Sequence, residues 1–105
     1  MIARVWRGTV RRGDADEYAD YIRATGFGAY GTTEGNRGAW LLQRDFERDG
    51  EGLTEFVTYS LWESWEAIKA FAGEDPEVAV LYPEDERFLV EGGAGATHFE
   101  VIDEV

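Results

Sequence analysis

The stretch at residues 59–73, YSLWESWEAIKAFAG, constrains the fold most, because it predicts a strand that runs into a helix with almost no linker. Its first residues suit a pleated surface, and apolar side chains then recur at the three-residue steps of a helix. Ser64 stands at the expected N-cap and Gly73 just past the expected end. Trp62 therefore falls at a corner where helix and sheet part, which is a suitable place for a pocket.

The length and charge of the chain limit the classes to which it can belong. Its 105 residues predict one domain, residues 1–105. Twenty-two acidic against ten basic residues give a net charge of −12, which repels a phosphate backbone or an anionic membrane surface. We therefore expect no nucleic-acid and no membrane partner. No apolar run approaches the roughly 18 residues of a membrane span, and cysteine is absent, so we expect a cytoplasmic protein.

The spacing of polar and apolar residues predicts six elements in the order β-α-β-β-α-β. Strands are predicted at residues 2–10, 39–46, 54–62 and 97–102, and helices at residues 14–25 and 64–72. A polar segment at residues 47–53 joins the second and third strands as a hairpin. This order is typical of an α+β, ferredoxin-like fold with a four-stranded antiparallel sheet.

Glycine and proline punctuate the rest of the chain. Residues 26–38 hold five glycines, which is too many for a regular element, so we expect a connector there. Glycines also let a backbone approach a ligand or move as a lid. Pro76 and Pro83 are each expected to open a short helical turn, and a glycine cluster at residues 92–95 is expected to release the chain into the last strand.

The helices of such a fold cover one face of the sheet, so the other face needs a cover. Aromatic residues make up 14% of the chain, and they either pack a core shared with a second subunit or line a cavity for a flat ligand. A second copy of the same chain is the economical cover, since symmetric dimers are the commonest oligomers. We therefore expect a homodimer.

Several short motifs together resemble one known family. They are VWRG near the start, GNRG before the second strand, SLWES and EAIKAFAGED around the second helix, YPEDERFL after it and THFEV near the end. The set is similar to the antibiotic-biosynthesis-monooxygenase family of dimeric α/β-barrel proteins, and the resemblance covers nearly the whole chain. It implies a ferredoxin-like subunit, a homodimer forming a dimeric α/β barrel, and a pocket in each subunit between the sheet and its helices.

Two kinds of relative imply different site residues. Haem-degrading relatives carry an Asn on the first strand, a Trp on the second helix and an iron-binding His beyond it, and these positions fall on Trp6, Phe71 and Leu81. All three are replaced here, which argues against haem degradation by that route. In cofactor-free relatives, which convert polyphenols to quinones, a Trp near the end of the third strand helps to bind the phenol. Trp62 stands at that place.

Oxygen attack on a phenolate or enolate needs a base and hydrogen-bond donors in a dry cavity. His98 is the only histidine, and its unperturbed pKa of about 6.5 suits a base at neutral pH. Trp62 and His98 are therefore the catalytic candidates. The alternatives are core packing for Trp62 and a hydrogen-bonded strand histidine at the dimer contact for His98.

Five further side chains are candidates for substrate binding, namely Arg4, Trp6, Tyr30, Phe71 and Tyr82. Arg4 shares a strand face with Trp6, and inside a pocket it would hold a phenolate or a carboxylate. Its alternative is an ion pair with one of the many carboxylates of the chain. Tyr30 and Tyr82 are candidate donors at a pocket mouth, with purely structural roles as their alternative.

The family resemblance, together with the lack of a metal or nucleotide motif, thus implies a monooxygenase that oxidises an aromatic or enolisable small molecule without a metal or other cofactor. A non-catalytic dimeric protein that binds a small hydrophobic ligand is the alternative. A haem-binding or haem-degrading protein is the third interpretation.

Overall fold

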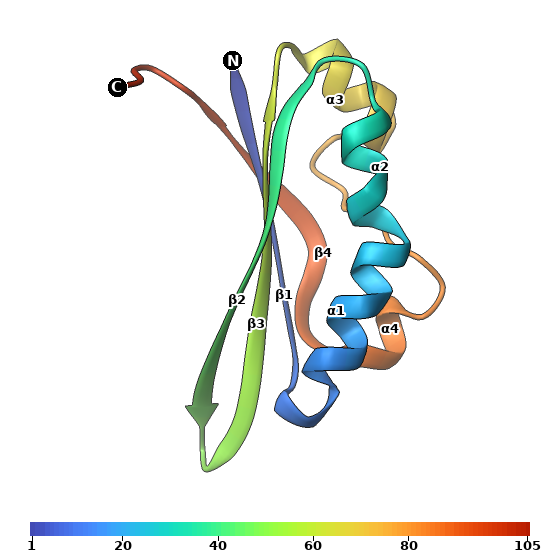
Figure 1. Cartoon of the computed structure of the whole chain (residues 1–105), viewed down its shortest axis with the longest axis vertical. Coiled ribbons are helices and arrows are strands. Elements are labelled where there is room, and N and C mark those ends of the chain that lie inside the picture. Colours follow the sequence, from blue (N-terminus) through green and yellow to red (C-terminus); the bar gives the residue numbers. More distant parts are fainter.

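The computed structural model describes residues 1–105 and contains one four-stranded antiparallel sheet with the helices on one face (Figure 1). The elements are β1 (Ile2–Arg11), the short 3-10 helix η1 (Arg12–Asp14), α1 (Ala15–Ala24), α2 (Gly26–Thr32), β2 (Asn36–Arg48), β3 (Glu51–Trp62), α3 (Trp65–Ala72), α4 (Asp85–Phe88) and β4 (Leu89–Glu100). The strand order is β2-β3-β1-β4. The predicted α+β, ferredoxin-like fold is confirmed. No helix is long and apolar enough to cross a membrane.

The central strand β1 positions the polar groups of the helix-facing side. It pairs with β3 on one side and β4 on the other, so that Arg4 lies opposite both Ser60 and His98. Side chains alternate along a strand, so Arg4 and Trp6 point to the same face as these partners. That face is the one that the helices cover, since Trp6 belongs to the same buried cluster as Tyr18 and Ile22 of α1.

The core on the helix side consists of two clusters of buried apolar side chains. The larger is formed by Trp6, Val10, Ala15, Tyr18, Ala19, Ile22, Phe56, Ala79 and Phe88. The smaller is formed by Ile2, Tyr30, Trp62 and Ile68. Phe27 of α2 packs against both clusters, so α2 connects them.

The strand-to-helix corner forms as predicted. β3 ends at Trp62, and α3 begins at Trp65 after a two-residue link. The hydroxyl of Ser64 accepts the backbone N–H of Ala67 at 3.2 Å, which is the N-cap bond. Gly73 ends the helix with φ at 95°, a value that glycine adopts without strain.

The glycine-rich segment folds differently from the prediction. Residues 26–32 form α2, so the expectation of no regular element there was wrong for this part. Phe27 and Tyr30 lie one helical turn apart, and Tyr30 is buried against Phe71 with 4.5 Å between the ring centroids. The packing of these rings outweighs the low helix propensity of glycine.

β4 begins earlier than predicted and includes the glycine cluster. Trp6 pairs with Ala96 and Gly8 with Gly92, so β4 carries two more residues than β1 between these pairs. Gly92 and Gly93 have φ values of 75° and 91°. The glycines form a bulge inside the strand, where the sequence suggested that they precede it.

The proline predictions had different outcomes. Pro76 opens no helix, because the chain there makes a turn and then an isolated bridge between Val78 and Gly95. Pro83 comes just before α4, a single helical turn. The predicted hairpin is confirmed and is tighter than expected, with only Asp49 and Gly50 between β2 and β3 and both at positive φ.

The sheet face opposite the helices is uncovered and carries large apolar side chains. Trp40, Leu42 and Phe99 are 48%, 49% and 55% exposed on this open face. Trp40 lies opposite Tyr59 and Leu42 opposite Val57 in the register of β2 and β3. Exposed apolar surface of this kind is typical of contact surfaces.

Candidate functional site

A cavity of about 50 Å³ lies between the sheet and the helices, with walls drawn from both core clusters. The structure places all five predicted substrate-binding side chains on its wall, namely Arg4, Trp6, Tyr30, Phe71 and Tyr82. The space is enough for about four water molecules, whereas benzene needs roughly 150 Å³ in an engineered protein cavity. A ring-sized ligand therefore requires part of the wall to move outward.

The part of the wall best suited to such movement is the contact between the α1–α2 junction and Tyr82. Thr25 breaks the helical path between α1 and α2, with φ at −115° and ψ at −100°. A Cβ atom on Gly26 would lie 3.0 Å from Cε2 of Tyr82, so the two segments touch with no space to spare. Neither a strand ladder nor a helix joins them.

Arg4 is a buried cation on the floor of the cavity, with 2% of its surface exposed. Its Nη1 donates to the Pro76 carbonyl and lies 2.9 Å from Nε2 of His98. Its Nε is buried and has no hydrogen-bond partner. None of the ion pairs in the structure includes Arg4, so the carboxylate pairing considered from the sequence does not form. Burial lowers the pKa of Arg4, and Tyr30 opposes that shift.

Tyr30 brings a phenol into the same cavity. Its hydroxyl shares a hydrogen bond of 3.0 Å with Oγ1 of Thr58 on β3. Burial raises the pKa of the Tyr30 hydroxyl, while the hydrogen bond with Thr58 and the charge of Arg4 act in the opposite direction. Tyr30 therefore stays protonated at neutral pH.

Asp85 and Tyr18 form a second polar group on the wall. The Tyr18 hydroxyl donates to Oδ1 of Asp85 at 2.7 Å, and the backbone N–H of Tyr82 donates to Oδ2 at 2.7 Å. Burial and the neighbouring carboxylate raise the pKa of Tyr18, so this hydroxyl remains a donor. Asp85 is 6% exposed and is the only acidic side chain that lines the cavity.

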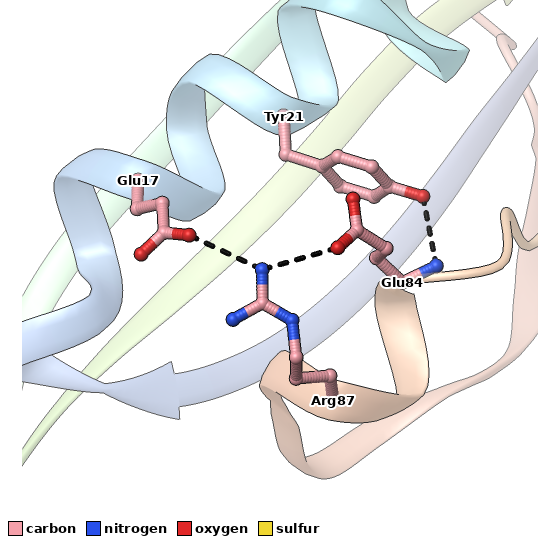
Figure 2. Close-up of polar contacts among 4 residues, drawn as sticks. All are labelled: Glu17, Tyr21, Glu84 and Arg87. Carbon is pink, nitrogen blue, oxygen red and sulfur yellow. Dashed lines mark hydrogen bonds and ion pairs between the residues drawn. The ribbon is translucent and has the colours of Figure 1, made fainter.

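A group of exposed polar contacts holds α4, and with it Asp85, against α1. Figure 2 shows Nη2 of Arg87 between the carboxylates of Glu17, at 3.1 Å, and Glu84, at 3.3 Å. The hydroxyl of Tyr21 accepts the backbone N–H of Glu84 at 3.0 Å. Exposed ion pairs are individually weak, so these contacts orient α4 more than they stabilise the fold.

Trp62 lies behind the cavity and does not line it. The residue is fully buried, and its indole Nε1 donates to the Ser60 hydroxyl at 2.9 Å. Its ring centroid lies 6.1 Å from that of Tyr30 and 5.4 Å from that of Phe71. Trp62 thus supports two rings of the wall.

His98 lies beside Arg4 at the β4 edge, and it is also not among the side chains that line the cavity. An arginine can only donate, so Nε2 of His98 accepts the Arg4 hydrogen bond and the imidazole is neutral. Burial lowers the pKa of His98, the charge of Arg4 lowers it further, and Glu77 acts in the opposite direction. The ring also contacts Trp65, with 5.0 Å between centroids.

The lowered pKa of His98 predicts a pH dependence of stability. In the unfolded state His98 binds a proton near pH 6.5, and in the folded state it does so only at lower pH. The stability that the folded state gains from the lowered pKa of His98 is therefore complete above the pKa of the unfolded state. It is lost as the pH falls through the pKa of the folded state. Wild type should therefore lose more stability between about pH 8 and about pH 5 than a His98→Gln variant, whose amide accepts the Arg4 bond without titrating. Urea denaturation of both proteins at each pH checks this. An equal change in the free energy of unfolding of the two proteins between these pH values would contradict the prediction.

Sequence reasoning missed Asp85, Tyr18 and Thr58 as wall residues. Tyr18 lies on the apolar stripe of α1 with Ala15, Ala19 and Ile22, a position that is typical of core packing. Asp85 was one acidic residue in an acidic segment, and only the fold brings it against Tyr18 across 67 residues of chain. Of these three residues, only Thr58 could have been predicted from the sequence. The alternation of side chains along β3 places it on the same face as Trp62.

Comparison with known proteins gives matches to solved structures. No protein-family model matches the sequence, and neither does any curated protein. A protein from Bacillus cereus described as an antibiotic biosynthesis monooxygenase has a TM-score of 0.64 at 21% identity, over 100% of this chain and 94% of its own. A variant of MhuD with two manganese protoporphyrin IX molecules bound per active site has a TM-score of 0.59 at 20% identity, over 100% of this chain and 98% of its own.

At these identities the likeness is one of fold. It confirms, at that level, the resemblance that the sequence motifs indicate, and it extends over the whole chain. This protein has the fold of an antibiotic biosynthesis monooxygenase.

Proposed function

We propose that the chain is a monooxygenase that oxidises an aromatic or enolisable small molecule in the cavity, without a cofactor. The observation that carries the proposal is the ring-lined space between sheet and helices, with one acidic and one basic side chain, Asp85 and Arg4, on its wall. The fold supports it, since a structural neighbour is described as an antibiotic biosynthesis monooxygenase.

Within this proposal Asp85 is the base. Its carboxylate takes the proton of a phenol or enol, and the resulting electron-rich anion passes one electron to O₂. The two radicals combine with formation of a C–O bond, and the resulting peroxide anion takes the proton back from Asp85. The O–O bond and the C–H bond at the same carbon then break, and water leaves with formation of a carbonyl group. The positive charge of Arg4 favours the anionic form of the substrate, and the surrounding rings restrict water.

Trp62 and His98, which the sequence suggested as catalytic, act as positioning residues in this scheme. Trp62 holds the rings of Tyr30 and Phe71 in place. His98 accepts a hydrogen bond from Arg4 and fixes its guanidinium. Trp62→Phe and His98→Gln should therefore change KM more than kcat, whereas loss of a base changes kcat.

Oxygen consumption with a panel of hydroquinones and polyphenols tests the proposal. Wild type should consume O₂, and Asp85→Asn should lower kcat at least about 100-fold, the usual contribution of a positioned base. Glu86→Gln, an exposed neutralisation on the other side of Asp85 at a residue that takes part in no ion pair, is the matched control and should keep wild-type turnover. Equal turnover by Asp85→Asn and wild type would remove Asp85 from the mechanism.

One observation favours a second candidate, a binding protein without catalysis. The only histidine lies off the cavity wall, so the proton-accepting groups that face the cavity are few. Native mass spectrometry of protein from its own host should then show a retained small molecule. Turnover of a substrate with no retained ligand would exclude this candidate.

A porphyrin does not fit the cavity as it stands. A structural neighbour binds manganese protoporphyrin IX, but here the space is about 50 Å³ and no histidine, cysteine or methionine lines it. Pockets for drug-sized ligands measure roughly 300–1,000 Å³. Tyr82 supplies a phenol oxygen of a kind that ligates haem iron in some proteins, yet a haem would need the helices to move well apart. Haemin titration should therefore leave the Soret band unchanged.

We also propose that the open face binds a second copy of the chain. Trp40, Leu42 and Phe99 are about half exposed there, and no helix covers them (Figure 1). Burying such a face in a symmetric dimer removes apolar area from water. Light scattering at micromolar concentration should give the mass of a dimer for wild type and of a monomer for Leu42→Glu, which places a charge on this face.

The control for the dimer is the adjacent substitution Gln43→Glu. It adds the same charge to the same strand, but on the helix side of the sheet, opposite Phe56. This variant should remain dimeric. A monomeric wild type would overturn the proposal, and a dimeric Leu42→Glu would place the interface elsewhere.

A further inference from the structure

We infer that the ligand of the cavity carries an anionic oxygen group of the carboxylate class, which binds Nε of Arg4. The inference rests on the proposed function and deepens it by naming the class of ligand. Nη1 of Arg4 is already engaged by the Pro76 carbonyl and by His98. Nε is a donor that is buried, has no partner, and belongs to a side chain on the cavity wall.

No carboxylate of the chain lies within ion-pair distance, 4.0 Å, of Arg4. The guanidinium takes part in no ion pair, and its neighbours, the Pro76 carbonyl, the neutral His98 imidazole and the protonated Tyr30 hydroxyl, carry no negative charge. Asp85, the one carboxylate on the wall, accepts hydrogen bonds from Tyr18 and from the backbone of Tyr82 and makes no ion pair with Arg4. A buried cation without a charged partner is costly, and an anionic ligand would offset that cost.

The missing charge selects an anion over a neutral acceptor. A water molecule or an amide oxygen satisfies the free N–H of Arg4 but leaves its charge uncompensated. A carboxylate satisfies both, and hydrogen bonds between charged partners are about twice as strong as neutral ones. Phe71 lies beside the same guanidinium, with 5.8 Å between Cζ of Arg4 and the ring centroid of Phe71. The ring of Tyr30 stacks on the ring of Phe71. The structure therefore suits a flat ring that bears a carboxylate.

A matched pair of probes tests this without any mutation. Para-hydroxybenzoate and para-hydroxybenzamide have nearly the same shape, and only the first carries a charge. Isothermal titration under argon should show the benzoate binding about 10- to 100-fold more tightly. At saturation the Nε–H resonance of Arg4 should shift more with the benzoate than with the benzamide, because a bond to a charged acceptor is the stronger of the two. Equal affinities, no binding of either probe at millimolar concentration, or an unshifted resonance would overturn the inference.

A variant pair adds an independent test. Arg4→Lys keeps the charge and removes Nε, so it should weaken benzoate binding at least about tenfold and benzamide binding by a smaller factor. Arg7→Lys is the control, because Arg7 lies exposed on the same strand with its side chain on the other face. Benzoate affinity that is unchanged in Arg4→Lys would contradict the inference. If Arg4→Lys does not fold, the two probes on wild type decide.

The inference and the proposed function fail in different ways. Tight benzoate binding with no oxygen consumption on any polyphenol would support the Arg4 site and contradict the proposed oxygenase activity. Oxygen consumption with neutral and carboxylated phenols at equal kcat/KM would support the proposed oxygenase activity and contradict the Arg4 site.

Discussion

Replacing Trp62 by alanine should lower the free energy of unfolding by about 3–5 kcal/mol, the range for truncating a buried tryptophan. The side chain is fully buried and belongs to the smaller core cluster. Its ring contacts those of Tyr30 and Phe71, so its loss also removes the support of two cavity rings. In a domain of ordinary stability, about 5–15 kcal/mol, this is a large fraction of the total.

Urea denaturation followed by far-UV circular dichroism measures this loss without relying on tryptophan fluorescence. Trp62→Phe keeps a ring and loses the indole bond to Ser60, so it should cost about 1–2 kcal/mol. Trp65→Ala is the control, because Trp65 is 43% exposed and its truncation leaves no closed void. A loss from Trp62→Ala no larger than that from Trp65→Ala would show that the small cluster contributes little.

Gly93→Ala should destabilise the protein by about 2–4 kcal/mol, the second largest effect we expect. Its φ of 91° disfavours an L side chain, and a Cβ atom there would lie 2.5 Å from Cδ1 of Leu89. The carbonyl of Gly93 accepts the indole N–H of Trp6 at 2.9 Å. A displaced bulge therefore moves Trp6, and ligand affinity should fall together with stability.

The hairpin glycine provides the matched control for this substitution. Gly50 has φ at 79°, and a Cβ atom added to it meets nothing within 4 Å. Gly50→Ala therefore carries the backbone strain alone, about 1–2 kcal/mol. Thermal and urea denaturation of both variants separate strain from packing. Equal losses would mean that Leu89 moves aside at no cost.

The regular part of the fold could be predicted from local patterns. Alternation identified the strands, and Ser64 and Gly73 marked both ends of α3, because caps depend on single residues and their neighbours. α2 and the β4 bulge could not be predicted in this way. Tyr30 stabilises α2 through Phe71, and Gly93 fits β4 through Trp6, and both contacts join distant parts of the chain.

The candidate site was predictable only in part. The alternation of β1 put Arg4 and Trp6 on one face, and the fold resemblance indicated a pocket on that face. Which charges meet there was not predictable, because it depends on side chains from separate elements. Arg4 was expected to face either an anion or one of 22 acidic residues, and the structure shows it paired with none of them.

For a carboxylate ligand of the class inferred above, the position of Arg4 should reverse the usual effect of salt on capture. The chain as a whole has a net charge of −12, so an approaching carboxylate is repelled until it enters the cavity. At roughly 0.1 M ionic strength, screening over about 10 Å weakens that repulsion. The buried guanidinium lies out of contact with the ions, so its hold on the ligand is little affected. Added salt thus speeds association and leaves dissociation nearly constant.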